Sequence, residues 1–281
     1  DELAWTTGAS AGVSSAYASA ETKAEFGVFI TPELASVLSK RDFVLNPLIS
    51  AKPWCLIQGN LVTTVPKNIE TDRTIAMEPD INSLFQRAIG KRLRRCLLRY
   101  GIDLRDQTSN QRACIHAYNR RLATLDLKDA SYSVLYFPVM QVFPEDWGTL
   151  FDCTRSHKGT FSQRKDAICQ PSSAKWFEYQ MLSSMGNGYT FELESTLFFA
   201  ICMACGVPQD LIWVYGDDII IPQSYVQLVT SVLKVFGLSV NTVKSFTDGA
   251  FFESCGVYSF TGADVTPFKI KDLLNEDKDC I

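Results

Sequence analysis

The stretch from Leu211 to Ile221, LIWVYGDDIII, places two adjacent carboxylates between two apolar runs rich in β-branched and aromatic residues. The pattern predicts a β-hairpin whose short connection is Gly216-Asp217-Asp218. Two carboxylates at the tip of a buried hairpin repel each other and lose hydration. A divalent cation such as Mg²⁺ or Mn²⁺ would remove that cost, because it prefers oxygen ligands. An ordinary polar turn is the alternative, since Gly and Asp are common turn residues.

A third carboxylate, Asp126, lies inside the run from Leu122 to Leu127, LATLDL, which predicts a short buried strand. An Asp among apolar residues is costly unless it is paired or ligates a cation. With helices predicted at 190–205 and 225–236 and a strand at 238–241, the order of elements makes a split βαβ unit. We therefore expect an α+β fold, with an antiparallel sheet backed by two helices. Asp126 would then meet Asp217 and Asp218 in a site suited to two Mg²⁺ ions about 4 Å apart.

The basic residues cluster, although the net charge of −4 (27 Lys and Arg against 31 Asp and Glu) does not indicate a nucleic-acid binder. A hairpin predicted over 61–76 carries Lys67 and Arg73, which could face a polyanion or simply be solvated. A helix capped by Asp80 and ending before Gly101 carries basic residues, with no acidic one among them, on the face opposite its apolar stripe. Such a face is as consistent with phosphate contact as with plain solvation. The cations assigned to RNA contact are Arg87, Lys91, Arg94, Arg95, Arg155 and Lys158.

A loop with two glycines, SSMGNG at 183–188, precedes the helix predicted from Thr190 to about Cys205. Such a loop leaves backbone N–H groups open to an anionic or sugar-phosphate partner, or is merely a well-capped connection. The Cys202-x-x-Cys205 pair within that helix is interpreted as two core thiols, because a zinc site lacks further ligands here.

The length of 281 residues and a hydrophobic content of 46% are enough for a substantial core. Of the nine cysteines, the seven outside the Cys202-x-x-Cys205 pair are scattered, which suits reduced thiols in a cytosol-like compartment. No apolar run is long enough to span a membrane and no signal-peptide pattern opens the chain, so a soluble intracellular protein is expected. The chain starts at Asp1 without a Met, so we expect a fragment of a longer protein.

Several motifs occur in an order that matches one known family. The chain resembles the RNA-directed RNA polymerases (replicase β subunits) of the single-stranded RNA bacteriophages, the leviviruses, over about residues 61–268 and only weakly over 1–60. The most specific stretch is SSMGNGYTFELES at 183–195. The others are VPKN…TDR…EP at 65–79, DQT-x-NQR at 106–112, LAT-x-DL at 122–127, VYGDDII at 214–220, NT-x-K at 241–244, F-x-ESCG at 252–256 and DVTPF at 264–268.

This resemblance implies a right-hand polymerase fold. Residues 1–60 would be a partial fingers or N-terminal segment, 61–121 fingers with motif F and the basic helix, 122–265 the catalytic palm, and 266–281 the start of a thumb. The implied activity is two-metal-ion synthesis of RNA from NTPs on an RNA template, in the cytoplasm of the bacterial host. The resemblance also implies host translation elongation factors Tu and Ts and a host ribosomal protein as partners.

The family's site residues carry over onto matching positions. Asp126 (motif A), Asp217 and Asp218 (motif C) would be catalytic and would bind two Mg²⁺ or Mn²⁺ ions, and Lys244 lies near the general acid of motif D. The nucleotide-binding residues implied by motifs F and B are Lys67, Arg73, Ser184, Gly186 and Asn187.

One position departs from the family pattern. The second motif A aspartate of such polymerases senses the ribose 2′-hydroxyl, and an ungapped alignment puts Tyr132 there, with Asp129 three positions too early. Asn187 or Ser184 is then the alternative for ribonucleotide selection.

Three rival functions share parts of this pattern. They are a reverse-transcriptase-like polymerase, a catalytically inactive or incomplete palm-fold fragment that binds RNA, and a metal-dependent nuclease. The loop at 183–188 and Gly216 disfavour the first. The intact Asp126, Asp217 and Asp218 disfavour the second. A nuclease would not need the Lys67 and Arg73 clamp.

Overall fold

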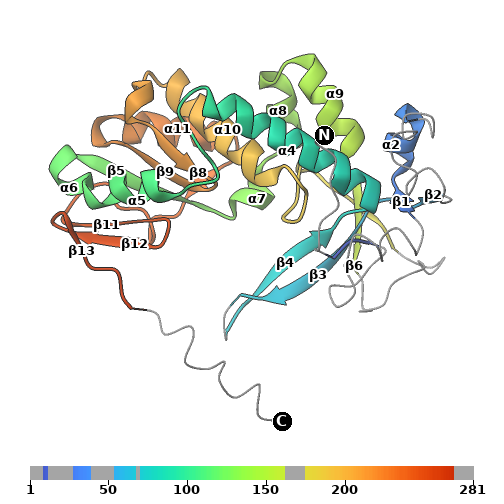
Figure 1. Cartoon of the computed structure of the whole chain (residues 1–281), viewed down its shortest axis with the longest axis horizontal. Helices are drawn as coiled ribbons and strands as arrows, with labels where there is room; N and C mark the ends of the chain where they lie inside the picture. Colours follow the sequence, from blue (N-terminus) through green and yellow to red (C-terminus); the bar gives the residue numbers. More distant parts are fainter. Residues whose placement is uncertain (1–8, 12–27, 39–53, 68–69, 162–174, 269–281) are drawn as a thin grey trace, which may run out of the picture.

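A computed structural model describes residues 9–11, 28–38, 54–67, 70–161 and 175–268 (Figure 1). The expected N-terminal segment over 1–60 and the expected start of a thumb over 266–281 lie largely outside these residues. Within the described part of the chain, no helix combines the length and the apolar character needed to cross a bilayer.

The central sheet has four strands in the order β10 (Ser239–Val240), β5 (Leu122–Lys128), β9 (Asp218–Pro222) and β8 (Trp213–Tyr215). All three pairings are antiparallel, so the predicted sheet and the predicted hairpin over 211–221 are confirmed. The register pairs Asp126 with Asp218 and Tyr215 with Asp218, which leaves Gly216 and Asp217 as a two-residue turn.

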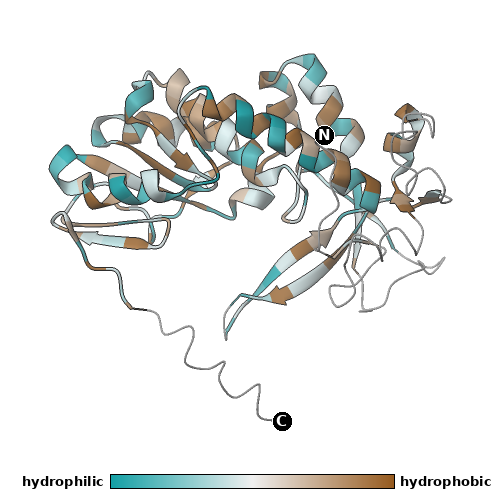
Figure 2. Ribbon diagram, in the orientation of Figure 1, coloured by the Kyte–Doolittle hydropathy of each residue, from teal (hydrophilic) through white to brown (hydrophobic). Residues whose placement is uncertain are grey.

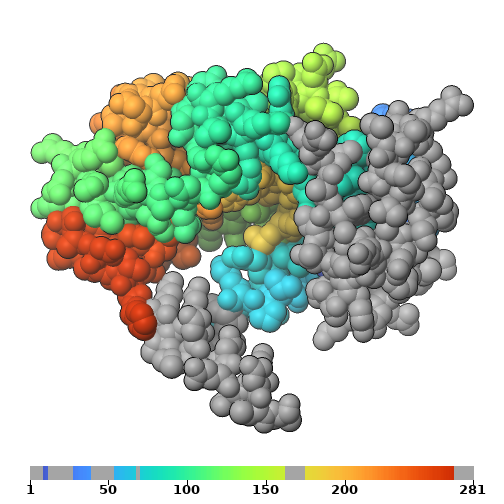
Figure 3. Space-filling model, in the orientation of Figure 1, coloured from blue at the N-terminus to red at the C-terminus, as the bar shows by residue number. Residues whose placement is uncertain are grey.

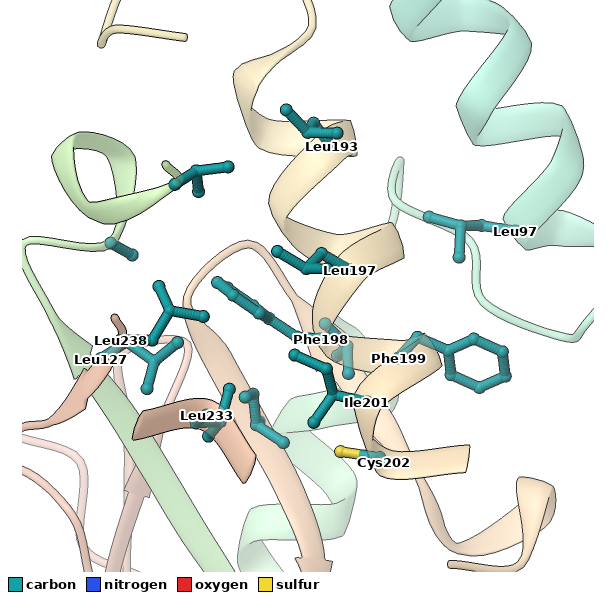
Figure 4. Packing of buried hydrophobic residues seen from close by; sticks show 14 of the residues in the cluster. Leu97, Leu127, Leu193, Leu197, Phe198, Phe199, Ile201, Cys202, Leu233 and Leu238 are labelled. Carbon is teal, nitrogen blue, oxygen red and sulfur yellow. The ribbon is translucent and has the colours of Figure 1, made fainter. Parts of the chain in front are cut away.

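Helices α10 (Thr190–Ala204) and α11 (Val226–Val235) cover one face of this sheet, as the sequence pattern predicts. Ile219 and Ile221 of β9 point to that face, because alternate residues of a strand share a side. Figure 4 shows Phe198 of α10 directed toward Leu127 and Leu238, at the centre of this core.

The opposite face is covered by α5 (Thr108–Ile115) and by β11 (Phe251–Ser254). Ile220 packs there with Leu122, Cys114 and Phe252. The α5 helix, which the sequence assigns to the fingers, therefore packs as part of the same unit as the palm sheet. A three-stranded antiparallel sheet continues from β11 through β12 (Val257–Phe260) to β13 (Ala263–Asp264).

A second four-stranded sheet contains the hairpin predicted over 61–76, formed by β3 (Asn60–Pro66) and β4 (Asp72–Met77). Strand β6 (Lys158–Phe161) pairs parallel to β3, and β7 (Phe177–Glu178) pairs with β6. Sequence patterns did not predict these two additions. Figure 1 shows the β3–β4 hairpin projecting away from the central sheet.

Helix α4 (Asp80–Leu98) links the helices that cover the central sheet to the N-terminal strand β1 (Val28–Ile30). It packs on α10, on α9 (Glu145–Thr154) and on β1. Its predicted apolar stripe is largely buried, and Figure 2 shows polar and apolar residues alternating along it. The predicted cap is wrong: Pro79 is the N-cap, and the Asp80 carboxylate instead accepts a hydrogen bond from the Phe29 N–H at 3.2 Å. That contact ties the helix to β1.

The remaining elements are short. Helix α2 (Pro32–Val37) begins at the proline, and the next described strand, β2 (Trp54–Leu56), pairs parallel to β1. Three further helices are α6 (Ala117–Arg120), α7 (Ala130–Ser133) and α8 (Tyr136–Val142). Turns of 3₁₀ helix precede β8 and α11, at η3 (Gln209–Leu211) and η4 (Gln223–Tyr225). Cys202 is buried in α10 as a free thiol.

Candidate active site

The central sheet places Asp126 and Asp218 directly opposite each other in the antiparallel ladder of β5 and β9. Directly opposed residues project to the same face. The two aspartates project to the face that also carries Leu122 and Ile220, which is the face away from α10 and α11. Asp217 occupies the adjoining turn. The carboxylate-bearing residues at 126, 217 and 218, distant in sequence, are thus brought to one end of the sheet.

The absence of a side chain at Gly216 lets this hairpin pack closely against α10. The φ of Gly216 is +62°, and a Cβ there would lie 2.5 Å from the Phe191 ring. Its N–H donates to the Ser195 hydroxyl at 3.0 Å, and Phe191 packs edge-on against Tyr215. The hairpin that carries Asp217 is therefore held by the helix that follows the 183–188 loop.

The electrostatics of the site couple residues from four segments. Burial raises the pKa of Asp126, as does the negative charge of Asp217, whereas the positive charges of Lys244 and Lys67 lower it. Burial and the charges of Asp217 and Glu253 raise the pKa of Asp218 to about 6. The charges of Lys67 at the hairpin tip and of Lys244 after β10 thus act on the same carboxylate.

The two opposed carboxylates have different protein partners. Asn241 donates from Nδ2 to Asp126 at 2.9 Å. Asp218 accepts from the Ser254 hydroxyl and from the Cys255 N–H, each at 3.2 Å. Sequence patterns did not identify these partners, because each lies far along the chain from the carboxylate that it contacts.

These contacts bear on the expected metal ions. Within the described residues, no group of three or more His, Cys, Asp or Glu side chains is gathered closely enough to hold a metal ion. The donors nevertheless fit a divalent cation in kind, because the charge of Asp217 is felt by both neighbouring aspartates and a cation would offset that repulsion. A cation held by all three aspartates would share Asp126 with Asn241, and Asp218 with Ser254 and Cys255.

The 183–188 loop lies against strand β4. The Ala76 N–H donates to the Met185 carbonyl at 2.8 Å, and Gly186 has φ +117°. Ser184 and Asn187 are buried. The Ser184 carbonyl accepts a hydrogen bond from the Thr190 hydroxyl. The loop therefore lies against the base of the hairpin whose tip bears Lys67. Figure 3 shows the molecule hollowed between this hairpin and β11–β13.

The Tyr132 side chain contacts the β3–β4 hairpin. Its hydroxyl donates to the backbone carbonyl of Thr74 in β4. Burial raises the pKa of the phenol. The side chain thus connects the segment after Asp126 to the β3–β4 hairpin.

Four of the six cations assigned to RNA contact lie on α4, and their surroundings differ. Lys91 and Arg95 are exposed on α4, and Arg87 is half-buried, with its pKa lowered by burial. Arg94 makes an ion pair with Glu192 at 2.5 Å and donates to the Leu104 carbonyl, so it holds α4 to α10.

Two cations outside α4 complete the set. Arg155 is only 7% exposed, pairs with Asp152 at 3.0 Å and stacks over Tyr136. Its burial and these contacts favour a structural role over the predicted RNA contact. Lys158 Nζ lies 3.9 Å from the Glu178 carboxylate.

An antiparallel sheet backed by helices, with aspartates at one hairpin tip, has the α+β architecture of a polymerase palm. The chain belongs to the RNA replicase β-chain family, whose model, described as "RNA replicase, beta-chain", matches residues 1–281.

Curated relatives agree with this family. The RNA-directed RNA polymerase β chain of Enterobacteria phage fr is 41% identical over 79% of this chain, which spans 39% of that protein. The corresponding subunit of Escherichia virus Qbeta is 40% identical over 79% of this chain and 37% of its own length. That of Escherichia phage MS2 is 40% identical over 77% of this chain and 38% of its own. The chain thus spans about two fifths of the length of these relatives.

Proposed function

We propose that this chain carries the catalytic palm, over 122–265, and part of the fingers, over 61–121, of an enzyme that synthesises RNA from NTPs on an RNA template. Such an activity would replicate a viral RNA genome. The observation that carries the proposal is the pairing of Asp126 with Asp218 beside Asp217, with Lys67 and Lys244 acting on Asp126. The names of the relatives support the choice of RNA as both template and product.

Phosphoryl transfer needs little from the protein beyond positioning and charge neutralisation. Two Mg²⁺ or Mn²⁺ ions, when bound by Asp126, Asp217 and Asp218, would activate the attacking hydroxyl and stabilise the leaving pyrophosphate. Lys67 and Arg73 would hold the triphosphate. Lys244 would donate a proton to the leaving group.

The proposal also covers RNA and nucleotide contacts outside the aspartates, the cellular location and the host partners. Ser184, Gly186 and Asn187 would position the nucleotide and template, and the exposed cations of α4 would contact the RNA backbone. By family resemblance, the enzyme would act in the cytoplasm of the bacterial host. Its partners there would be host translation elongation factors Tu and Ts and a host ribosomal protein.

Primer extension on an RNA template with Mg²⁺ tests the proposal, with wild type compared with Asp217→Asn in the full-length protein. We expect Asp217→Asn to reduce NTP incorporation by about a hundredfold or more, since an essential charge at the reacting centre is lost, and to spare RNA binding. Asp210→Asn, an exposed carboxylate on η3, is the control and should leave synthesis unchanged.

Each rival has its own outcome. Preferential incorporation of dNTPs would favour a reverse-transcriptase-like enzyme. Loss of synthesis and of RNA binding together in Asp217→Asn would favour a palm-fold RNA-binding fragment. Pyrophosphate released on each NTP addition excludes a nuclease.

A further inference from the structure

A buried network of polar side chains lies between the β3–β4 hairpin and the 183–188 loop. At its centre is the carboxylate of Glu78, 3% exposed, where the hairpin ends and α4 is about to begin. One oxygen accepts from Asn60 Nδ2 at 2.8 Å. The other accepts from Gln86 Nε2 at 3.0 Å and from the Ser156 hydroxyl at 2.6 Å. Three donors thus converge on one acid from three separate segments.

Gln86 carries this network to the loop. Its side chain is fully buried, and its Oε1 accepts from the Gly188 N–H at 3.0 Å. Its Nε2 donates to Glu78 and also to the Thr154 carbonyl at 2.9 Å. A side-chain amide presents its oxygen on one side and its NH₂ group on the other. Because Glu78 and Thr154 both accept, the amide oxygen of Gln86 must face Gly188.

Glu78 is suited to fix this orientation. Burial raises its pKa, while the hydrogen bonds from Ser156, Asn60 and Gln86 lower it. Its two oxygens face the amide N–H groups of Asn60 and Gln86, which can only donate, so Glu78 serves as the acceptor toward both amides.

We propose that Glu78 and Gln86 form a positioning relay: the Glu78 carboxylate orients the Gln86 amide, which holds the Gly188 backbone and so sets the 183–188 loop against the β3–β4 hairpin. The consequence for catalysis rests on the proposed function, in which that loop and that hairpin contact one nucleotide. Neither residue touches the reacting atoms, so both are positioning residues.

Helix α4 offers a matched control one turn before Gln86. Asn82 is equally buried and also donates to the Thr154 carbonyl, at 3.0 Å, but its other partner is Thr31 rather than the loop. Replacing either amide with an apolar residue of similar size removes several buried hydrogen bonds. Only the change at Gln86 removes the hydrogen bond to Gly188.

The test compares Gln86→Met with Asn82→Leu in the full-length protein, by hydrogen–deuterium exchange over 183–190 and by steady-state NTP incorporation. Loss of one hydrogen bond, worth about 1 kcal/mol, should speed exchange of the loop about fivefold in Gln86→Met. We expect the KM for NTP to rise more than kcat falls. Asn82→Leu should lower the thermal midpoint comparably but leave loop exchange and KM near wild type.

Exchanging the side chains of Glu78 and Gln86 tests their direct interaction. It also provides a second test if Gln86→Met fails to fold. Gln86→Glu alone puts two buried carboxylates together and should be severely destabilising. Adding Glu78→Gln restores one acid and one amide, and the carboxylate introduced at position 86 can still accept from the Gly188 N–H. The double variant Glu78→Gln/Gln86→Glu loses the bond to the Thr154 carbonyl, which keeps its bond from Asn82. It should therefore be more stable than Gln86→Glu alone and regain part of the loop protection.

The outcomes separate the relay from the proposed function. Equal loop exchange and equal KM in Gln86→Met and Asn82→Leu would overturn the relay, as would an exchanged pair no better than Gln86→Glu alone. Absence of RNA synthesis by wild type would overturn the proposed function, while hydrogen exchange would still decide whether the relay holds the loop.

Discussion

Gly186 and Ala76 lie so close together that a Cβ on Gly186 would come within 2.1 Å of the Ala76 carbonyl oxygen. The close approach joins the loop after β7 to strand β4, and the adjacent Met185 carbonyl accepts the Ala76 N–H. Two segments far apart in sequence therefore share one backbone interface, at the point where the proposed nucleotide site requires both of them.

Gly186→Ala should disrupt this interface. The φ of +117° already disfavours an L side chain, and the clash is with backbone that cannot turn aside. We expect NTP incorporation to fall at least tenfold, equivalent to about 1.4 kcal/mol in the activation free energy. Gly206→Ala is the control, because Gly206 has φ +79° but open space around it, and should cost about 1 kcal/mol of stability only. Similar activity in the two variants would contradict the expectation.

Tyr132→Phe should leave the choice between NTPs and dNTPs unchanged, because the hydroxyl of Tyr132 is engaged by the Thr74 carbonyl. Losing that hydrogen bond should lower the free energy of unfolding by about 1 kcal/mol. It should also raise the KM for NTPs, because the hairpin is held less firmly. The measurement is the ratio of NTP to dNTP incorporation efficiency, with the exposed Tyr118→Phe as control. A changed ratio in Tyr132→Phe would assign ribose selection to Tyr132.

Glu194→Gln should change how stability depends on pH. Burial, with the charges of Asp217 and Glu192, raises the pKa of Glu194 from 4.5 to about 8, and its Oε1 has no hydrogen-bond partner. Between these values the unfolded chain has released a proton that the folded protein keeps. The free energy of unfolding therefore falls as pH rises from about 5 to about 8, by at most about 1.4 kcal/mol per pH unit.

The measurement for Glu194 is chemical unfolding across that pH range in the presence of a chelator. Glu194→Gln should be more stable than wild type at pH 8, and the difference should vanish near pH 5. Asp103→Asn is the control, because the Arg105 partner lowers the pKa of Asp103 to about 2, outside this window. A pH profile of Glu194→Gln parallel to that of wild type would exclude the raised pKa.

Lys91→Gln/Arg95→Gln should weaken RNA binding and make it less sensitive to salt. For single-stranded RNA, each phosphate that is no longer neutralised should reduce the slope of log affinity against log salt by about 0.7. Arg155→Gln should leave that slope unchanged and instead lower stability by about 1–3 kcal/mol, because a buried charged hydrogen bond is removed. Salt titrations of RNA binding distinguish the two. An equal slope change in Arg155→Gln would mean that Arg155 reaches RNA.

The local elements of the site follow from the sequence. The hairpin over 211–221, the strand over 122–127 and the helix beginning at Thr190 and ending before Gly206 are all present as predicted. Alternating apolar residues, β-branched runs and the turn requirement at Gly216 act over only a few residues, so they can be identified from a single chain. The same local signals carry the resemblance to the replicase family.

Other features depend on contacts between distant segments. The parallel pairing of β6 with β3, the burial of Arg155, and the engagement of Asp218 by Ser254 and Cys255 have no local signal. A cation is exposed or buried according to what packs against it, and a carboxylate is free or occupied according to which turn lies beside it. The sequence by itself determined which elements form and which acids lie in them. Only the tertiary structure decided which face each acid shares and which partner it meets, because those depend on side chains brought together from remote parts of the chain.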